Sequence, residues 1–271
     1  MEANKIKGEA KSIVLANGIE LTYCERGQEH KEIMLCGAFY YHTAMPLVEM
    51  LASRYHVYGI VMRFDGLTSE KNADGTIHWG RQWGKDVYDF ARAMGISKFH
   101  YFGKCHGTVP GWYLIKEHPE MLLSFSSFFL APHVRPQNSN HWFELLGRSD
   151  AREMMRVAMR KPEGLQAKMA ELAAIGENTT NPAIPKYAAN PEKLWPSKEE
   201  CIQTLTTLSV PVAYLFGSED PLFDDYFDSN LFAIRHTKGA HTVILEGERH
   251  LMELDNPERV VKEVFSFIDG I

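Results

Sequence analysis

A cysteine flanked by two glycines is the feature of this sequence that could do covalent chemistry. Residues 103–107 read Gly-Lys-Cys-His-Gly, directly after the strand-like run 98–102 and at the start of a helical pattern. A helix N-terminus carries partial positive charge, which favours the thiolate form of a cysteine placed there. Glycine on both sides relieves crowding at so tight a turn, and the next backbone N–H points to where an oxyanion would form. We therefore predict that Cys105 is a nucleophile; the alternative is a buried structural thiol, the commonest fate of free cysteine.

An acid and a histidine follow Cys105 along the chain, each just after a predicted strand. The run 210–217 leads to Asp220, and the run 241–246 leads to His250. A nucleophilic thiol needs such a pair, because the histidine takes the proton and the acid orients the imidazole. The alternatives are a helix N-cap role for Asp220 and an ordinary surface loop for His250, which is one of twelve histidines.

Strand-like and helical segments alternate along most of the chain, and this alternation must position the three residues. The predicted strands are 11–16, 19–25, 32–36, 56–62, 98–102, 124–131, 210–217 and 241–246. The predicted helices are 42–53, 78–95, 106–117, a stretch after 217 and the last helix, 257–268. The first two strands are expected to form a hairpin around Asn17-Gly18. The later alternation predicts right-handed βαβ units and a mostly parallel sheet.

The alternation breaks between residues 132 and 208. This segment is helical in pattern, rich in methionine and proline, and holds no convincing strand. Open α/β sheets bind ligands outside the carboxyl ends of their strands, so we expect a helical cap over that end; the alternative is extra core helices. The predicted division is a core domain of residues 1–131 and 209–271 with a cap insertion at 132–208. Within the cap, Trp142 and Phe143 are candidates for contacting a substrate.

Together, the sequences around Cys105, Asp220 and His250 resemble the motifs of the α/β-hydrolase superfamily, with cysteine in place of the usual serine. The elbow motif of that family is G-x-S-x-G, and its triad follows in the order nucleophile, acid, histidine, as Cys105, Asp220 and His250 do here. The Asp-Pro step at 220–221 and the Asn-Pro-Glu opening of the last helix are also in the family's style, and the resemblance spans residues 10–270. It implies an α/β-hydrolase fold, with a mostly parallel central sheet flanked by helices, and a Cys-Asp-His triad.

The resemblance also implies an oxyanion hole made of backbone amides. One donor is the amide of His106. The other follows the third strand, where the family usually has His-Gly-x and this sequence has Cys36-Gly37-Ala38. By position the second donor is the Ala38 amide, or the next amide if the loop is shifted by one. The aromatic residues that follow are candidates for lining a substrate pocket, namely Phe39, Tyr40 and Tyr41.

The implied activity is hydrolysis of a small ester, lactone or thioester through a thioester on Cys105. His250 would take the thiol proton and later activate water, with Asp220 holding its tautomer. Lys104 is a candidate for lowering the pKa of the thiol, unless its side chain points away. Two alternatives stay open: acyl transfer to an acceptor other than water, and a non-catalytic ligand-binding protein on the same fold. No cofactor and no metal is expected.

Composition limits the class of protein. The chain has 271 residues, 45% of them hydrophobic, and a net charge of −6, which excludes a disordered chain and argues against a nucleic-acid partner. Four cysteines are too few for a disulfide scaffold, and none forms a CxxC pair for zinc. The N-terminus lacks the apolar core of a signal peptide, and no apolar run reaches membrane-spanning length. We therefore expect a cytoplasmic protein with a small-molecule acyl substrate and no membrane partner; a homodimer is left open.

Overall fold

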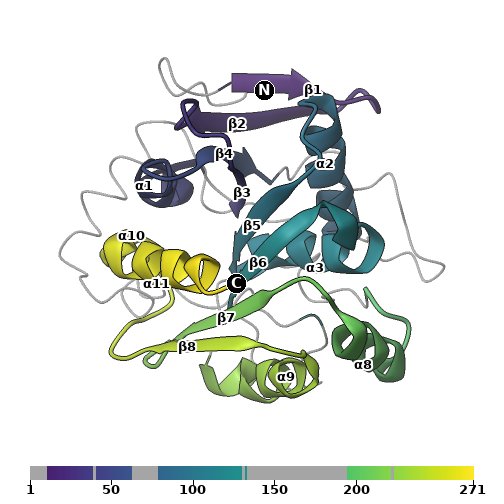
Figure 1. Cartoon of the computed structure of the whole chain (residues 1–271), viewed down its shortest axis with the longest axis vertical. Coiled ribbons are helices and arrows are strands. Elements are labelled where there is room, and N and C mark those ends of the chain that lie inside the picture. The colour runs from purple at the N-terminus through teal and green to yellow at the C-terminus, as the bar shows by residue number, and fades with distance from the viewer. Residues whose placement is uncertain (1–10, 39–40, 63–78, 130–131, 133–193, 221–222) are drawn as a thin grey trace, which may run out of the picture.

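The computed structural model describes residues 11–38, 41–62, 79–129, 132, 194–220 and 223–271. Their strands form one eight-stranded sheet in the order β1-β2-β4-β3-β5-β6-β7-β8 (Figure 1). Pairing is antiparallel from β1 to β2 and from β2 to β4, and parallel at every other step. The strands are β1 (Lys11–Val14), β2 (Glu20–Arg26), β3 (Ile33–Ala38), β4 (His56–Val61), β5 (Phe99–Lys104), β6 (Leu122–Phe128), β7 (Val212–Gly217) and β8 (His241–Leu245). The predicted mostly parallel sheet is confirmed.

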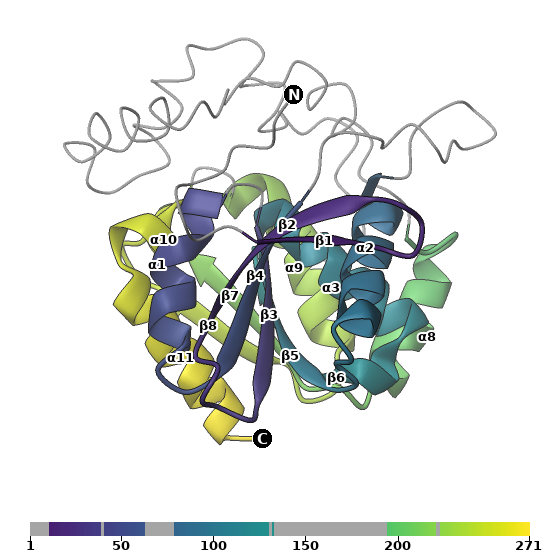
Figure 2. The same ribbon diagram turned by 90° about the horizontal axis from the view of Figure 1, so that it is seen from above.

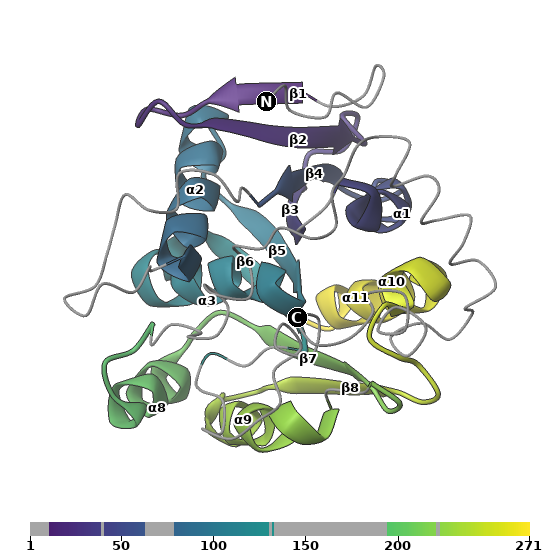
Figure 3. The same ribbon diagram turned by 180° about the vertical axis from the view of Figure 1, so that it is seen from behind.

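Helices cover both faces of this sheet. One face carries α1 (Tyr41–Leu51) and α11 (Pro257–Asp269), and the other carries α2 (Trp79–Ala93), α3 (Thr108–Glu117) and α8 (Lys198–Thr207) (Figures 1 and 2). Helix α9 (Phe223–His236) packs against α8 and β7. The view from behind in Figure 3 shows the same division. No helix in the described part of the chain has the length and apolarity to cross a bilayer.

The helices dock because each presents an apolar stripe. In α2, Trp83, Val87 and Phe90 recur at a spacing of three or four residues and are buried, while Lys85 faces solvent. Helix α11 buries its own stripe in the same way, with Val260, Val261, Val264 and Phe267. Apolar positions at this spacing lie on one face of a helix. Strand β6, covered on both sides, is buried almost throughout, as expected for a parallel strand inside an α/β sheet.

Two glycines make the turns that the sequence predicted. Gly18, with φ of +80°, closes the β1–β2 hairpin, and the amide of Leu15 donates to the carbonyl of Ile19 over 2.7 Å. Gly95, with φ of +70°, ends α2, and the amide of Ile96 donates back to the carbonyl of Ala91 over 2.8 Å. Both need the left-handed conformation that glycine adopts without a steric penalty.

Several boundaries differ from the expected ones. Strand β3 continues through Gly37 to Ala38, because Gly37 pairs with both β4 and β5. The helix expected at 106–117 opens with a 3₁₀ turn at Cys105–Gly107, and the α-helical part begins at Thr108. A short helix, α10 (Met252–Asp255), was not predicted. It has a single turn, too short for a periodic pattern.

Most of the expected cap, 132–208, lies outside the described residues. Its last part is described: α8 follows Trp195, and Ser197 caps the helix by accepting a hydrogen bond from the Glu200 amide over 3.1 Å. Trp195 and Cys201 belong to the same hydrophobic core as the sheet.

Candidate active site

The turn after β5 holds Cys105 in a strained backbone conformation. Its φ is 49°, in the left-handed region that non-glycine residues seldom occupy. The hydroxyl of Thr108 donates to the carbonyl of Cys105 over 2.7 Å and braces the turn. A Cβ at position 103 would lie 2.3 Å from the carbonyl oxygen of Gly107, so only glycine fits there. The predicted turn geometry is therefore present, and Cys105 itself is partly exposed.

Asp220 and His250 form a buried pair beside this turn. Asp220 follows β7, His250 follows β8, and His250 Nδ1 lies 2.7 Å from Asp220 Oδ2. The two loops are fastened together, since the Glu219 amide donates to the carbonyl of Glu248 over 2.9 Å. Because Nδ1 is bound to the carboxylate, the other ring nitrogen, Nε2, is the one that can exchange a proton with the thiol, and a hydrogen bond from His250 helps to lower the pKa of Cys105.

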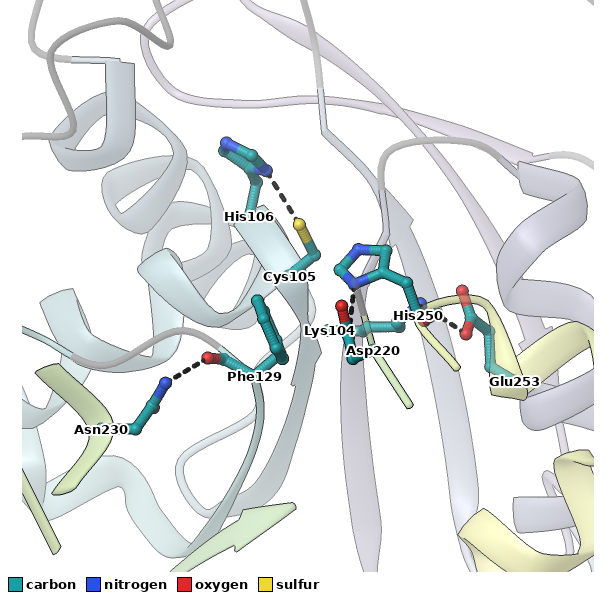
Figure 4. A network of polar contacts seen from close by, with 8 residues as sticks. All are labelled: Lys104, Cys105, His106, Phe129, Asp220, Asn230, His250 and Glu253. Carbon is teal, nitrogen blue, oxygen red and sulfur yellow. Dashed lines mark hydrogen bonds and ion pairs between the residues drawn. The ribbon is translucent and has the colours of Figure 1, made fainter. Parts of the chain in front are cut away.

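The Cys105 sulfur contacts an imidazole that the sequence did not single out. His106 Nδ1 lies 3.1 Å from Cys105 Sγ, and His106 is buried (Figure 4). Only the backbone amide of His106 was predicted to act. The sequence motif places His106 next to the nucleophile but does not say which way its side chain points.

Charges around the sulfur decide its ionisation. Burial opposes the thiolate, but the positive charges and hydrogen bonds of His106 and His250 outweigh burial and hold the pKa of Cys105 well below its usual range. Burial also acts against the imidazolium of His250, yet the Asp220 carboxylate, aided by the Cys105 thiolate, raises the pKa of His250 to about 9. Each shift favours a thiolate beside an imidazolium at neutral pH.

Phe129 and Asn230 hold the other side of the histidine. The Phe129 ring meets the His250 ring edge-on, with centroids 5.2 Å apart and planes at 90°. Phe129 has φ of 88°, a rare value for an aromatic residue. Its carbonyl accepts a hydrogen bond from Asn230 Nδ2 over 2.8 Å, which helps to hold this conformation (Figure 4).

Lys104 points away from the sulfur. Its ammonium group donates to the backbone carbonyl of His250 and forms a 2.6 Å ion pair with Glu253 of α10. Burial raises the pKa of Glu253, more than the charge of Lys104 lowers it. Lys104 is not among the groups that lower the pKa of Cys105. Of the two alternatives for Lys104, the structure therefore matches the one in which its side chain points away from the thiol, and Lys104 contacts the histidine loop, residues 246–253.

The expected oxyanion donors are only partly described. Ala38 ends β3, and its neighbour Gly37 pairs with Gly103 of β5, so the end of β3 lies next to the elbow. Cys36, where the family usually has histidine, is buried, and burial raises the pKa of its thiol. Tyr41 begins α1. Phe39, Tyr40, Trp142 and Phe143 lie outside the described residues. Among the residues that are described, no group of three His, Cys, Asp or Glu side chains is arranged to hold a metal ion.

Comparison with known proteins gives structural matches only. No protein-family model matches the chain, and no curated protein sequence matches it. A serine hydrolase from Cycloclasticus zankles has a TM-score of 0.76 at 16% identity and covers 97% of this chain and 98% of its own. The 2-hydroxy-6-oxo-6-phenylhexa-2,4-dienoate hydrolase from Rhodococcus sp. strain RHA1 has a TM-score of 0.72 at 17% identity, with 96% and 99% covered. An enol-lactonase from Burkholderia xenovorans LB400 has a TM-score of 0.70 at 17% identity, with 96% and 100% covered.

Proposed function

We propose that this chain, which has the α/β-hydrolase fold of those structures, is a hydrolase of small esters, lactones or thioesters that works through a thioester on Cys105. The observation that carries the proposal is a partly exposed cysteine on a strained strand–helix turn, beside a buried histidine bound 2.7 Å from a carboxylate. The names of the matched structures, which include hydrolases and an enol-lactonase, support the same class of reaction.

The first half-reaction forms the acyl-enzyme. The Cys105 thiolate attacks the acyl carbon, a C–S bond forms, and the carbonyl oxygen takes the electron pair. The amides of His106 and Ala38 hydrogen-bond to this oxyanion, and the loss of one such donor typically costs about two to three orders of magnitude in rate. His250 then gives its proton to the leaving group as the bond to that group breaks, while Asp220 stabilises the charge and tautomer of the imidazole.

The second half-reaction frees the enzyme. His250, now neutral, takes a proton from water as the water oxygen attacks the thioester carbon. The tetrahedral intermediate collapses, the C–S bond breaks, and the carboxylic acid leaves with the thiolate restored. If an alcohol or amine replaces water, the same steps give acyl transfer, which is the alternative reaction for this site. The steps need no metal and no cofactor.

The setting of the site is part of the proposal. Residues 132–193 would form most of the cap and, with Trp142, Phe143, Phe39, Tyr40 and Tyr41, would contact a small-molecule acyl substrate. A cytoplasmic location would keep Cys105 reduced, because thiols stay free in reducing compartments.

Intact-mass measurement after exposure to p-nitrophenyl acyl esters of increasing chain length tests the nucleophile. We expect one acyl mass on the wild-type protein, none on Cys105→Ala, and one on the matched control Cys201→Ala, whose thiol is fully buried. An adduct that persists in Cys105→Ala would contradict the assignment.

Product analysis separates the alternatives. Added alcohols or amines that appear in the product would indicate acyl transfer, and free acid alone would indicate hydrolysis. Ester binding with no adduct and no turnover would indicate a ligand-binding protein on the hydrolase fold and would end the catalytic proposal.

A further inference from the structure

We propose that the imidazole of His106 is a second partner of the Cys105 sulfur, so that the resting protein holds a thiolate between two imidazoles, those of His106 and His250. We further infer that this arrangement selects thioesters, and other acyl compounds with an acidic leaving group, over alkyl esters. The selection rests on the proposed function, whereas the thiolate between two imidazoles does not.

The contact of His106 with the sulfur is fixed by the surrounding structure. Its Nδ1 is 3.1 Å from Cys105 Sγ, and the residue is only 4% exposed, so the ring is held by packing. The turn that carries both residues is fixed by Thr108 and by Tyr101, whose hydroxyl donates to the carbonyl of Gly107 over 2.7 Å. Figure 4 shows the rings of His106 and His250 on different sides of the sulfur.

Two charged groups of the site, Asp220 and Lys104, act on His250. Asp220 binds His250 Nδ1 at 2.7 Å, and Lys104, paired with Glu253, lies at the backbone carbonyl of His250. The Asp220 carboxylate raises the pKa of His250, and the positive charge of Lys104 lowers it. For the sulfur, burial opposes ionisation, and both imidazoles favour it strongly enough to lower the pKa of Cys105 well below its usual range.

The consequence for substrates lies in the tetrahedral intermediate. A stabilised thiolate is a weak base, and sulfur of low basicity leaves readily. After the sulfur has added to an alkyl ester, the intermediate expels either the sulfur or an alkoxide, a far stronger base that needs a proton from His250. The intermediate therefore mostly expels the Cys105 thiolate and returns to the ester, unless His250 protonates the alkoxide oxygen first. In the intermediate formed from a thioester, both possible leaving groups are sulfur. The substrate thiolate can therefore leave without first taking a proton from His250.

The pH dependence of iodoacetamide alkylation tests the two-imidazole thiolate without any substrate. We expect the wild-type protein to be alkylated on Cys105 with a midpoint well below about 8.5, the value of a free cysteine. His106→Asn and His250→Asn should each raise the midpoint, and the double variant should raise it above the ordinary value, because burial then acts on the thiol without opposition. His106→Asn keeps the backbone amide, so the expected oxyanion donor is unchanged.

Controls keep this test decisive. His118→Asn removes a partly buried histidine that stacks on Tyr88 at 3.8 Å, and it should leave the midpoint of Cys105 unchanged. His106→Gln, which also keeps a polar side chain, replaces His106→Asn if that variant fails to fold. A midpoint that is the same in the wild type and in a folded His106 variant would overturn the proposal.

Turnover of matched acyl compounds tests the selection. For one acyl group we compare kcat/KM for an alkyl thioester and for the corresponding ethyl ester. The wild type should favour the thioester, and His106→Asn should narrow that preference by about tenfold, because its more basic sulfur competes less as a leaving group. Equal rates for the two substrates in the wild type would overturn the selection. No acylation by either substrate would end the proposed function and leave the alkylation result standing.

Discussion

The four cysteines of the chain differ in what surrounds their sulfur atoms. Burial raises the pKa of Cys201 to about 12 and also raises the pKa of Cys36. Cys105 lies beside two imidazoles, and their charge reverses the effect of burial. A thiol in an apolar core is inert, whereas one beside positive charge is reactive. Cys105 is therefore the cysteine of the four whose surroundings favour the thiolate.

Asp220→Asn should move the alkaline limit of activity. The thiolate forms above the lowered pKa of Cys105, and the imidazolium that protonates the leaving group persists up to a pKa of about 9. We expect a bell-shaped pH profile of kcat/KM for an alkyl ester, whose alkoxide leaving group needs the proton of His250, with its alkaline limb near pH 9. Because Asp220 raises the pKa of His250, its loss should shift that limb to lower pH and reduce the maximal rate by at least about tenfold.

The matched control for this experiment is Asp89→Asn, which removes a surface carboxylate paired with Lys85 at 2.7 Å. Its profile should coincide with that of the wild type. An alkaline limb that stays near pH 9 in Asp220→Asn would show that the limb does not report His250.

At the scale of elements, the elbow is a close approach of β5 to the helix after it. A Cβ on Gly103 would lie 2.3 Å from the carbonyl oxygen of Gly107 and 2.6 Å from Cα of Thr108, and both contacts are with backbone. We expect Gly103→Ala to destabilise the fold by about 3 kcal/mol or more, since overpacking against backbone cannot relax. The control Gly95→Ala has φ of +70° and open space around it, so it should cost only about 1–2 kcal/mol. Denaturant unfolding of both variants measures the difference, and equal losses would contradict this account.

An ion pair joins the elbow after β5 to α10, which follows the loop that carries His250. Lys104, at the end of β5, and Glu253, in α10, form a 2.6 Å pair in which both side chains are at most 10% exposed. Removing one partner of a buried pair leaves the other charge uncompensated. Lys104→Met should therefore lower the free energy of unfolding by about 3 kcal/mol, and Lys104→Met combined with Glu253→Leu should recover part of that loss.

An exposed pair gives the control for this link. Lys85→Met breaks a surface i,i+4 pair with Asp89 and should change stability by no more than about 1 kcal/mol. If Lys104→Met is no worse than Lys85→Met, the link does not stabilise the fold.

Strand and helix positions were predictable, because alternating or periodic apolar residues report which face of an element is buried. The site's order along the chain was predictable as well, since each residue follows a recognisable strand. The role of Lys104 was not, because its partner His250 lies 146 positions away and α10 is too short to show a pattern. The contact of the His106 side chain with the sulfur was not predicted either, because a sequence motif names the residue next to the nucleophile but does not say which way its side chain points.

At the scale of the whole molecule, parallel pairing brings distant segments to one edge of the sheet. Gly37 of β3 pairs with Gly103 of β5, β7 runs parallel beside β6, and β8 runs parallel beside β7. The loops that carry Cys105, Asp220 and His250 therefore leave neighbouring or nearby strands at the same end. Strands β5, β6 and β7 are buried almost throughout, and the other three thiols lie in the same hydrophobic core.

The native protein should consequently show one reactive thiol out of four. Cys24, Cys36 and Cys201 are at most 3% exposed and belong to the core, whereas Cys105 is partly exposed and favours the thiolate. Titration with an aromatic disulfide reagent should give one fast equivalent for the folded protein and four after unfolding. Cys105→Ala should lose the fast equivalent and keep three slow thiols, whose rate follows unfolding of the core. Two outcomes would contradict this expectation: a second fast equivalent in the native protein, or a fast equivalent that survives in Cys105→Ala. Either one would mean that another cysteine is accessible to the reagent in the folded protein.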